Sequence, residues 1–294
     1  MTTAWGGGLP AAPPGAGPRR PPGPVTDVRV TAVRADHHLE VPEKVATEEP
    51  MEIRAAGFGQ APEPVAVTMR TPGHDFELAA GFLVTEGLAL PGEIATVGYC
   101  DAVDDDHARW NTVTVSLTGP WAGSPRRNFL SNSSCGVCGK TSIDQVEVAC
   151  PTPPAGPPVA ASVLSCLPDR LRSAQRVFDK TGGLHAAGLF SAGGDLVVMR
   201  EDVGRHNAVD KVVGRGVLAR QAPPPGAVLM VSGRVSFEIA QKAAMAGVAV
   251  VAAVSAPSSL AVDTARRLGL TLAAFVRDDR FNVYSHPERI ELGG

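Results

Sequence analysis

The first half of the chain combines strand-like segments with one helical segment. Alternating apolar and polar side chains, or short β-branched runs bounded by turn residues, predict half-buried strands. They occur at residues 28–30, 51–54, 65–70, 97–100 and 111–117. Between them, residues 76–83 place apolar side chains at helical spacing, with Asp75 as the predicted N-cap and an end near Gly87. We therefore predict a small α+β domain over residues 25–125.

The second half alternates short apolar runs with segments of helical period. Strand-like runs occupy residues 227–231, 248–254 and 270–276, and helical spacing occupies residues 237–246 and 259–268. This order predicts an α/β layered domain with a largely parallel sheet over residues 161–294. Ligands of such sheets bind beyond the carboxyl ends of the strands, so residues 232–234, 255–257 and 277–280 are expected on one rim.

The segments outside these two patterns are rich in small and polar residues. Residues 1–24 consist mostly of Gly, Pro and Ala and predict a disordered tail. Residues 131–140 are polar and glycine-bearing without any period, and residues 150–158 are rich in proline. We predict a mobile loop and connector over residues 126–160.

Composition narrows the class of protein. The 294 residues are 44% hydrophobic and carry a net charge of −3 with scattered basic residues, so nucleic acid is not an expected partner. The longest apolar run, residues 248–254, is far too short to cross a membrane. Five cysteines, without a recognisable signal peptide, argue against a disulfide framework. A cytoplasmic protein is the expectation.

The pair Cys135 and Cys138 is the first candidate for chemistry. A Cys-x-x-Cys spacing allows two thiols to bond each other, bind one metal or share a transferred sulfur atom. A zinc site would need two further ligands at similar spacing, and a thioredoxin-like pair would follow a strand directly at the start of a helix. Neither pattern is present, yet a zinc-stabilised binding module and a thiol-disulfide oxidoreductase both remain open.

Charged residues at predicted strand ends form the second candidate. Arg205 and His206 lie where a strand-like segment gives way to a helix, a position that suits an anionic ligand, although a solvated turn would look similar. Ser232 and Arg234 follow the strand at 227–231 and should share its rim. Together they favour a nucleotide-type ligand. A Gly-x-Gly-x-x-Gly string and a Walker loop are both missing, which disfavours a Rossmann or P-loop site.

Several unusual strings occur together and in order. With them, the chain resembles the formate dehydrogenase accessory sulfurtransferase family from about residue 28 to residue 290. The strings are Arg-Thr-Pro-Gly-His-Asp at 70–75, Cys-Gly-Val-Cys-Gly at 135–139, Thr-Gly-Gly-Leu-His at 181–185, Glu-Asp-Val-Gly-Arg-His-Asn-Ala at 201–208, Ser-Gly-Arg at 232–234 and Arg-Phe-Asn-Val-Tyr at 280–284.

The resemblance implies a function and a set of partners. A cysteine desulfurase would hand sulfane sulfur to Cys135, with Cys138 assisting transfer to the molybdenum of a bis(molybdopterin guanine dinucleotide) cofactor. That cofactor would be bound as cargo for formate dehydrogenase, with no metal held directly by the protein. A second copy of the chain is expected as a homodimer partner. The stretch that would contact the cofactor consists of Phe275, Val276, Arg277, Asp278, Asp279 and Arg280.

The resemblance also implies a fold. The family's C-terminal domain is cytidine-deaminase-like, so we expect an α/β layered domain of that kind beside a smaller N-terminal α+β domain. Deaminases need His-x-Glu followed by Pro-Cys-x-x-Cys. Here the cysteine pair precedes His185, and Ala187 stands where the glutamate would be required. Deamination is therefore not expected.

Overall fold

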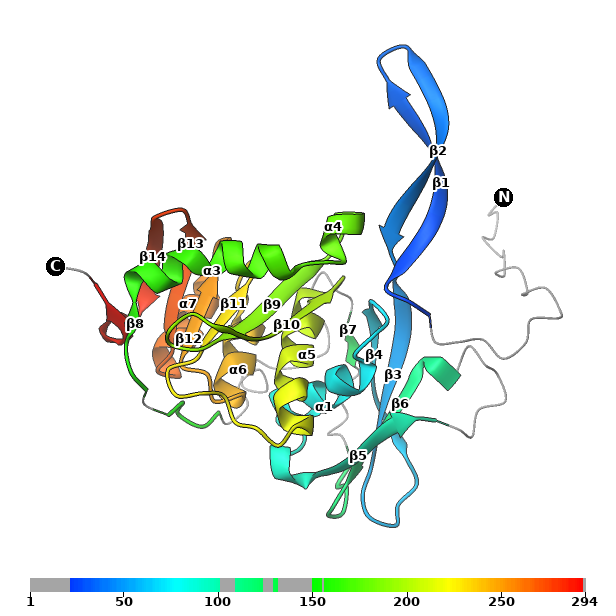
Figure 1. Cartoon of the computed structure of the whole chain (residues 1–294). Helices are drawn as coiled ribbons and strands as arrows, with labels where there is room; N and C mark the ends of the chain where they lie inside the picture. The colour runs from blue at the N-terminus through cyan, green and yellow to red at the C-terminus, as the bar shows by residue number, and fades with distance from the viewer. Residues whose placement is uncertain (1–21, 101–108, 124–128, 132–149, 155, 293–294) are drawn as a thin grey trace, which may run out of the picture.

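The described part of the chain begins with a hairpin that projects from the rest of the protein. The computed structural model describes residues 22–100, 109–123, 129–131, 150–154 and 156–292. Strands β1 (Val25–Arg34) and β2 (His37–Ala46) pair antiparallel as a separate two-stranded sheet (Figure 1). Residues 28–30, which the pattern predicts for the sheet of the N-terminal domain, lie in this hairpin instead.

A five-stranded sheet with one helix follows. The strands lie in the order β5-β6-β3-β4-β7. They are β3 (Glu49–Ala56), β4 (Glu63–Arg70), β5 (Ile94–Tyr99), β6 (Thr112–Leu117) and β7 (Phe129–Ser131). Helix α1 (Asp75–Thr85) packs its apolar residues onto strands β3, β4 and β6, and a 3-10 turn (Pro91–Glu93) precedes β5. The predicted N-cap is wrong, because α1 is preceded by His74 in the left-handed region and the Asp75 carboxylate binds Arg70.

The second unit is built on a six-stranded sheet in the order β10-β9-β11-β12-β13-β14. Its strands are β9 (His185–Phe190), β10 (Leu196–Asp202), β11 (Val228–Val231), β12 (Val250–Ala253), β13 (Thr271–Arg277) and β14 (Arg280–Ser285). Only β11, β12 and β13 run parallel to one another, whereas β9, β10 and β14 join antiparallel. The predicted largely parallel sheet is therefore a mixed sheet.

Helices cover both faces of this sheet. On one face lies α3 (Ala161–Ala174), and on the other lie α5 (Arg205–Leu218), α6 (Phe237–Met245) and α7 (Ser259–Arg267) (Figure 1). Because both faces are covered, the central strands are continuous apolar runs, which is why the sequence predicts them correctly. The remaining short elements are α4 (Phe178–Thr181), a 3-10 turn (Pro287–Arg289) and the paired strands β8 (Val159–Ala160) and β15 (Ile290–Glu291).

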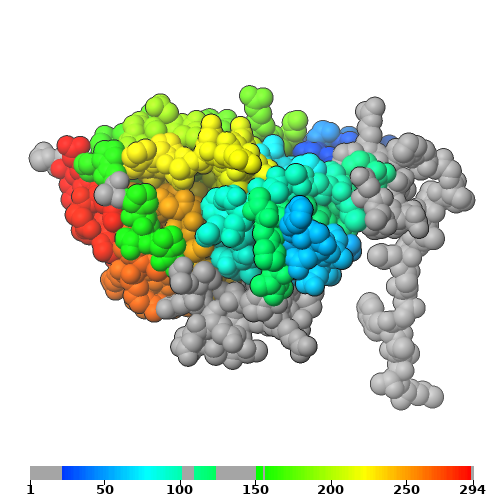
Figure 2. All heavy atoms as spheres, turned by 90° about the horizontal axis from the view of Figure 1, so that it is seen from below, coloured from blue at the N-terminus to red at the C-terminus, as the bar shows by residue number. Residues whose placement is uncertain are grey.

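The two sheet units meet where α1 crosses α5, and Figure 2 shows them side by side. The crossing depends on two glycines. A β-carbon on Gly81 would lie 1.8 Å from the Asp210 carbonyl oxygen, and one on Gly214 would lie 1.8 Å from the Glu77 carbonyl oxygen. No other residue type fits at either position without separating the helices. Since α1 is buried on nearly all sides, it serves both units as core.

A buried ion cluster lies beside this crossing. The Lys242 amino group is 2.9 Å from Asp210 Oδ1, 2.9 Å from Glu86 Oε1 and 2.9 Å from Thr85 Oγ1. Burial by itself would lower the pKa of Lys242, but Asp210 and Glu86 outweigh it and raise the pKa above its usual value. Lys242 therefore stays charged, and removing it would leave the buried Asp210 carboxylate with only the Thr85 hydroxyl to offset its charge. None of the described helices is long and apolar enough to span a membrane.

Candidate functional site

The carboxyl ends of four strands, the start of a fifth and the starts of three helices meet at one end of the six-stranded sheet. The parallel strands β11, β12 and β13 terminate at this end, and the antiparallel pairing of β9 with β11 places the start of β9 there too. Strand β10 ends beside it, and α5, α6 and α7 begin a few residues beyond β10, β11 and β12. We call residues 185, 202–206, 232–236, 254–259 and 275–280 the strand-end rim. Helix N-termini concentrate N–H donors and positive potential here.

The centre of the rim is formed by His185, Gly233 and Arg205. A β-carbon on Gly233 would lie 3.3 Å from His185 Nδ1 and 3.8 Å from Arg205 Cδ, so the two side chains lie against this glycine. The Nε atom of Arg205 is buried and has no hydrogen-bond partner in the described chain. Burial, with Arg205 and His206 nearby, holds the pKa of His185 below its usual value against the opposing effect of Asp202. His185 is therefore neutral at pH 7.

Two predicted site residues already have partners within the protein. The Ser232 hydroxyl accepts a hydrogen bond from the Ala186 N–H at 2.9 Å. His206 Nε2 lies 2.9 Å from Glu238 Oε2 and 3.1 Å from Ser236 Oγ. Ser232 therefore fixes the strand end, and the imidazole of His206 ties the start of α5 to the start of α6. Both lie on the rim, as predicted, but their side chains are engaged.

The turn that precedes α5 is held by the other sheet unit. Asp202 is fully buried, lies 2.7 Å from Lys211 Nζ and accepts a hydrogen bond from the Thr71 N–H at 3.1 Å. In return, the Val203 N–H donates to Thr71 Oγ1 at 3.2 Å, and Lys211 Nζ donates to the Thr71 carbonyl oxygen at 2.8 Å. Thr71 is thus a positioning residue that sequence reasoning missed.

The loop that carries Thr71 is fixed by an ion pair between the first and last residues of the same Arg-Thr-Pro-Gly-His-Asp string. Arg70 is fully buried, and its guanidinium contacts Asp75 through Nε at 3.1 Å and through Nη2 at 3.0 Å. Nη2 also donates to Asn111 Oδ1 at 2.9 Å. The bidentate ion pair fixes the loop that carries Thr71. The only signal for this role in the sequence is an arginine and an aspartate on either side of a Pro-Gly turn.

A bulged hairpin forms the far end of the rim. Pairing between β13 and β14 shifts register between Ala274 and Arg277, and both Phe275 and Asp278 have positive φ angles, of 55° and 53°. Arg277, Asp278, Asp279 and Arg280 are all exposed. Val276 is completely buried in the core under α3, so its side chain is not available to a ligand. Arg234, another predicted site residue, is also exposed.

The candidate sulfur carriers Cys135 and Cys138 lie outside the described residues. Among the described cysteines, Cys100 and Cys166 are free thiols. In the described ranges, no cluster of three His, Cys, Asp or Glu side chains could hold a metal ion. The alternatives left open for the Cys135–Cys138 pair are not decided by these observations.

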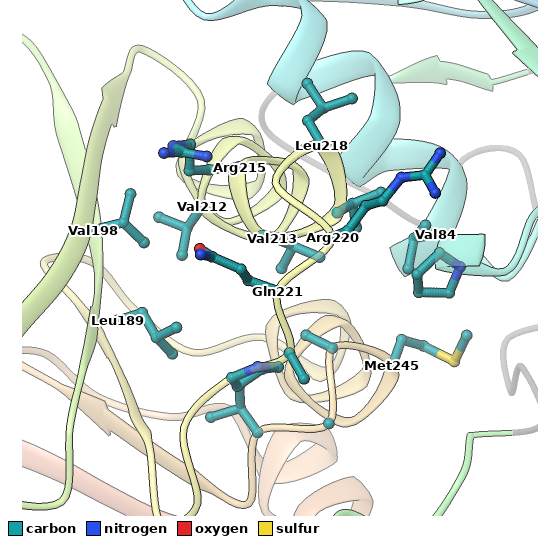
Figure 3. A pocket seen from close by; sticks show the side chains of 18 of the residues that line it. Val84, Leu189, Val198, Val212, Val213, Arg215, Leu218, Arg220, Gln221 and Met245 are labelled. Carbon is teal, nitrogen blue, oxygen red and sulfur yellow. The ribbon is translucent and has the colours of Figure 1, made fainter. Parts of the chain in front are cut away.

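The large cavity of the described chain lies elsewhere. It measures about 1020 Å³, and it is lined by α1, the ends of α5 and α6 and the edge of β10, with Val84, Val198, Val213 and Met245 among its apolar residues (Figure 3). None of the predicted site residues lines it. Arg200, Arg215 and Arg220 also line it, but the first two lie near the Glu77 carboxylate. The carboxyl ends of α5 and α6 adjoin the cavity, and their helix dipoles oppose an anion there. The strand-end rim is the better candidate for an anionic ligand.

These features define a mixed α/β protein in which exposed arginines and three helix N-termini share one end of the six-stranded sheet. Residues 46–291 match the FdhD/NarQ family. The chain is 51% identical over 270 residues to the sulfur carrier protein FdhD of Mycolicibacterium paratuberculosis, covering 89% of this chain and 97% of that one. It is 51% identical over 259 residues to its namesake from Streptomyces coelicolor, with coverage of 85% and 90%.

A solved structure resembles this chain over most of its length. A chain from Desulfotalea psychrophila assigned as a putative formate dehydrogenase accessory protein aligns with a TM-score of 0.70 and 26% identity, covering 91% of this chain and 99% of that one. The chain described here belongs to the FdhD/NarQ family, which confirms the resemblance seen in its sequence.

Proposed function

We propose that this protein is a sulfur carrier that acts in the maturation of formate dehydrogenase. The observation that carries the proposal is the likeness over nearly the whole length of the chain to proteins named sulfur carrier protein FdhD. The proposed donor is a cysteine desulfurase, and the proposed acceptor is the bis(molybdopterin guanine dinucleotide) cofactor of formate dehydrogenase. In this proposal the chain is a sulfurtransferase of the cytoplasm.

The chemistry is assigned to Cys135 and Cys138. The Cys135 thiolate attacks the outer sulfur of the desulfurase persulfide, the S–S bond of that persulfide breaks, and the desulfurase cysteine leaves as a thiolate. If Cys138 then attacks the inner sulfur of Cys135, the outer sulfur leaves as sulfide for the molybdenum, and a disulfide remains. A cellular thiol must reduce that disulfide before the next cycle.

The cofactor's guanine-dinucleotide end is assigned to the strand-end rim. Its phosphates need cations and N–H donors, and the rim offers the partly unpaired Arg205 guanidinium and the start of α5. Arg277 on β13 and Arg280 on β14 are exposed on the bulged hairpin, two and three strands from β11 and so roughly 10–15 Å away. That separation suits a ligand longer than a single phosphate group.

We propose that the six-stranded unit shares its layering with the cytidine deaminases but does not catalyse deamination. We also propose that the boundary between the two domains falls within residues 126–160. Ala187, which stands where a deaminase would need its glutamate, is completely buried in β9. A glutamate there would have its carboxylate in the core under α5.

Labelled-sulfur transfer tests the carrier role. Wild-type protein, Cys135→Ala and Cys138→Ala are each incubated with a desulfurase and labelled cysteine, and persulfide on the Cys135 peptide is measured by mass spectrometry. We expect Cys135→Ala to load no sulfur, and Cys138→Ala to load sulfur but to restore little formate dehydrogenase activity in cells that lack the wild-type protein. Normal loading of both variants would exclude this cysteine pair as the carrier. Stoichiometric zinc in the purified protein would instead favour a zinc-stabilised module.

Nucleotide binding tests the rim. Guanosine diphosphate copies part of the cofactor's nucleotide end, and calorimetry should show that it binds more tightly than adenosine diphosphate. Arg280→Ala should weaken guanosine diphosphate binding by roughly tenfold to a hundredfold, since one charge-assisted contact contributes about 1.5–3 kcal/mol. Arg220→Ala, on the cavity at the opposite edge, is the matched control and should leave affinity unchanged. Equal binding of the two nucleotides would contradict the assignment.

A further inference from the structure

A second surface of the described chain combines an apolar cavity with exposed apolar side chains. The cavity at α1 and the ends of α5 and α6 measures about 1020 Å³, at the upper limit of sites for small ligands, and it is open to solvent. Of its lining residues, Leu218 is 40% and Val197 is 52% exposed. Leu90, next to the lining residue Pro91, is exposed as well. Apolar surface of this extent is typical of a site that binds another protein.

The depth of the cavity is apolar and its mouth is cationic. At the bottom lie Leu189, Val212 and Leu229, which are buried core residues. At the mouth lie Arg215 and Arg220, which are both exposed. Their guanidinium groups lie on opposite sides of the cavity (Figure 3). The described residues that line the cavity include no aspartate or glutamate, so the charge at its mouth is positive.

Arg220 occupies a backbone position that favours glycine. Helices α5, α6 and α7 each end with one residue in the left-handed region just beyond the helix. That residue is Gly247 after α6 and Gly269 after α7, but it is Arg220, with a φ of 53°, after α5. An arginine is less stable than a glycine in this conformation. Its side chain forms no ion pair within the described chain, so it is available to a partner.

A single carboxylate lies beside the other two arginines of the lining. Arg200 Nη2 donates to Glu77 Oε1 at 2.8 Å, and Arg215 Nε lies 4.0 Å from the same oxygen. One negative charge therefore faces two positive charges, and Arg220 adds a third. The carboxyl ends of α5 and α6 oppose an anion inside the cavity. Carboxylates that complement the arginines therefore belong at the mouth, with apolar groups below them.

We propose that this surface docks an amphipathic helix of a partner protein, with apolar side chains on one face and carboxylates beside them. The apolar side chains enter the cavity over Val212 and Leu229, and the carboxylates pair with Arg215 and Arg220. A helix fits because most lining residues come from helices and loops, so that side chains and not a strand edge make the contact.

The docking surface is separate from the strand-end rim, because no rim residue lines the cavity. The inference therefore does not rest on sulfur transfer or on nucleotide binding. The contact combines apolar burial with charges that stay at its solvent-exposed border. Such border charges mainly set which partner binds and how binding depends on salt, whereas the apolar depth contributes most of the affinity.

Two synthetic peptides test the charge requirement with the full-length protein. Each has about 18 residues, with leucines at the spacing of one helix face. The other positions hold glutamate and alanine in one peptide, and lysine and alanine in the other. Fluorescence anisotropy at low salt should show saturable micromolar binding of the glutamate peptide and at least about tenfold weaker binding of the lysine peptide. Added salt should weaken binding of the glutamate peptide.

Variants of Arg220 separate binding from stability. Because glycine adopts the left-handed region without strain, Arg220→Gly should melt no lower than the wild type, yet bind the glutamate peptide at least about fivefold more weakly. Arg220→Glu should reverse the preference between the two peptides. Arg176→Glu, at an exposed arginine just after α3, changes the net charge equally and is the matched control. It should change affinity less than about twofold.

An apolar replacement tests the depth of the contact. Leu218→Asp should weaken the glutamate peptide by at least about tenfold, whereas Val33→Asp, exposed on the hairpin, should change affinity less than about twofold. Unchanged melting temperatures would show that both variants are folded. Equal binding of the two peptides, no saturable binding of either, or full affinity in Arg220→Gly would each overturn the proposal. So would decanoate that binds where the glutamate peptide does not, which would assign the cavity to a small amphipathic acid, or a fall in the native mass of Leu218→Asp, which would assign the surface to a contact between copies.

Discussion

The chemistry of the rim depends on how its side chains are shared between structure and ligand. Asp202, Ser232 and His206 are taken up by contacts inside the protein, and these contacts hold the start of α5 and the end of β11 in place. Arg205 and His185 remain, one a cation with a buried Nε lacking a partner in the described chain and the other a neutral imidazole. An anion bound at this point would be attracted by the Arg205 guanidinium directly. Protonation of His185 would place a second positive charge beside it.

The affinity of the rim for an anion should therefore depend on pH in a definite direction. The pKa of His185 is depressed in the free protein, and a bound diphosphate would raise it, so binding takes up a proton. Affinity should therefore rise as the pH falls from 7.5 toward 6, by roughly threefold to tenfold. Calorimetry of guanosine diphosphate binding in buffers of different ionisation enthalpy measures the proton uptake.

A variant without this histidine separates the effect from titration of the phosphate itself. His185→Gln keeps a polar side chain against Gly233 but cannot take up a proton. Its affinity should depend on pH only as the nucleotide's own ionisation requires. If wild type and His185→Gln show the same pH profile and proton uptake, His185 does not face the phosphates.

At the scale of elements, the most restrictive contact is the crossing of α1 and α5. Glycine normally weakens a helix by about 1 kcal/mol relative to alanine. Here, Gly81 and Gly214 are required because each backbone lies against the other helix, where a β-carbon would overlap a carbonyl oxygen. The two helices are thereby fixed at a separation that also buries Lys242 with Asp210.

Replacing one of these glycines should reverse the usual effect of alanine in a helix. We expect Gly81→Ala to lower the free energy of unfolding by at least about 2 kcal/mol, since overpacking outweighs the gain in helix propensity. Urea denaturation measures the change. Gly216→Ala in the partner helix α5 is the comparison, because its β-carbon would lie 3.1 Å from the Gln221 carbonyl oxygen and needs only a small adjustment. Equal effects of the two replacements would mean that the crossing tolerates a wider separation.

At the scale of the whole molecule, the sequence predicts those strands and helices whose formation depends on the local pattern of apolar residues. The central strands β11, β12 and β13 are apolar runs bounded by turns, and their parallel order brings residues 232–234 and 277–280 to one rim, as expected. The direction of β9 and β14 was not predicted, because neither β9, inside the sheet, nor β14, at its edge, has a local pattern that distinguishes an antiparallel strand from a parallel one. The mixed sheet follows from those two elements and β10.

Contacts between distant segments could not be predicted either. Thr71 and Asp202 are 131 residues apart, and nothing in the spacing of either string indicates that one holds the other. The buried state of Val276 and the occupied side chains of Ser232 and His206 likewise depend on packing from other elements. The sequence thus predicted that these residues share one end of the sheet, but not which of their side chains are engaged inside the protein.

The contact between Thr71 and the turn before α5 makes the five-stranded unit part of the site on the other unit. Thr71→Val keeps the shape of the side chain but removes the acceptor for the Val203 N–H. Because this loosens the turn that presents Arg205, guanosine diphosphate should bind roughly threefold to tenfold more weakly, the free energy of about one hydrogen bond. Thr112→Val makes the same change at a buried position on β6 and should leave affinity unchanged. Calorimetry on both variants, with melting temperatures as the check on folding, measures the difference. Identical affinities for Thr71→Val and the wild type would show that the two units fold against each other without sharing the site.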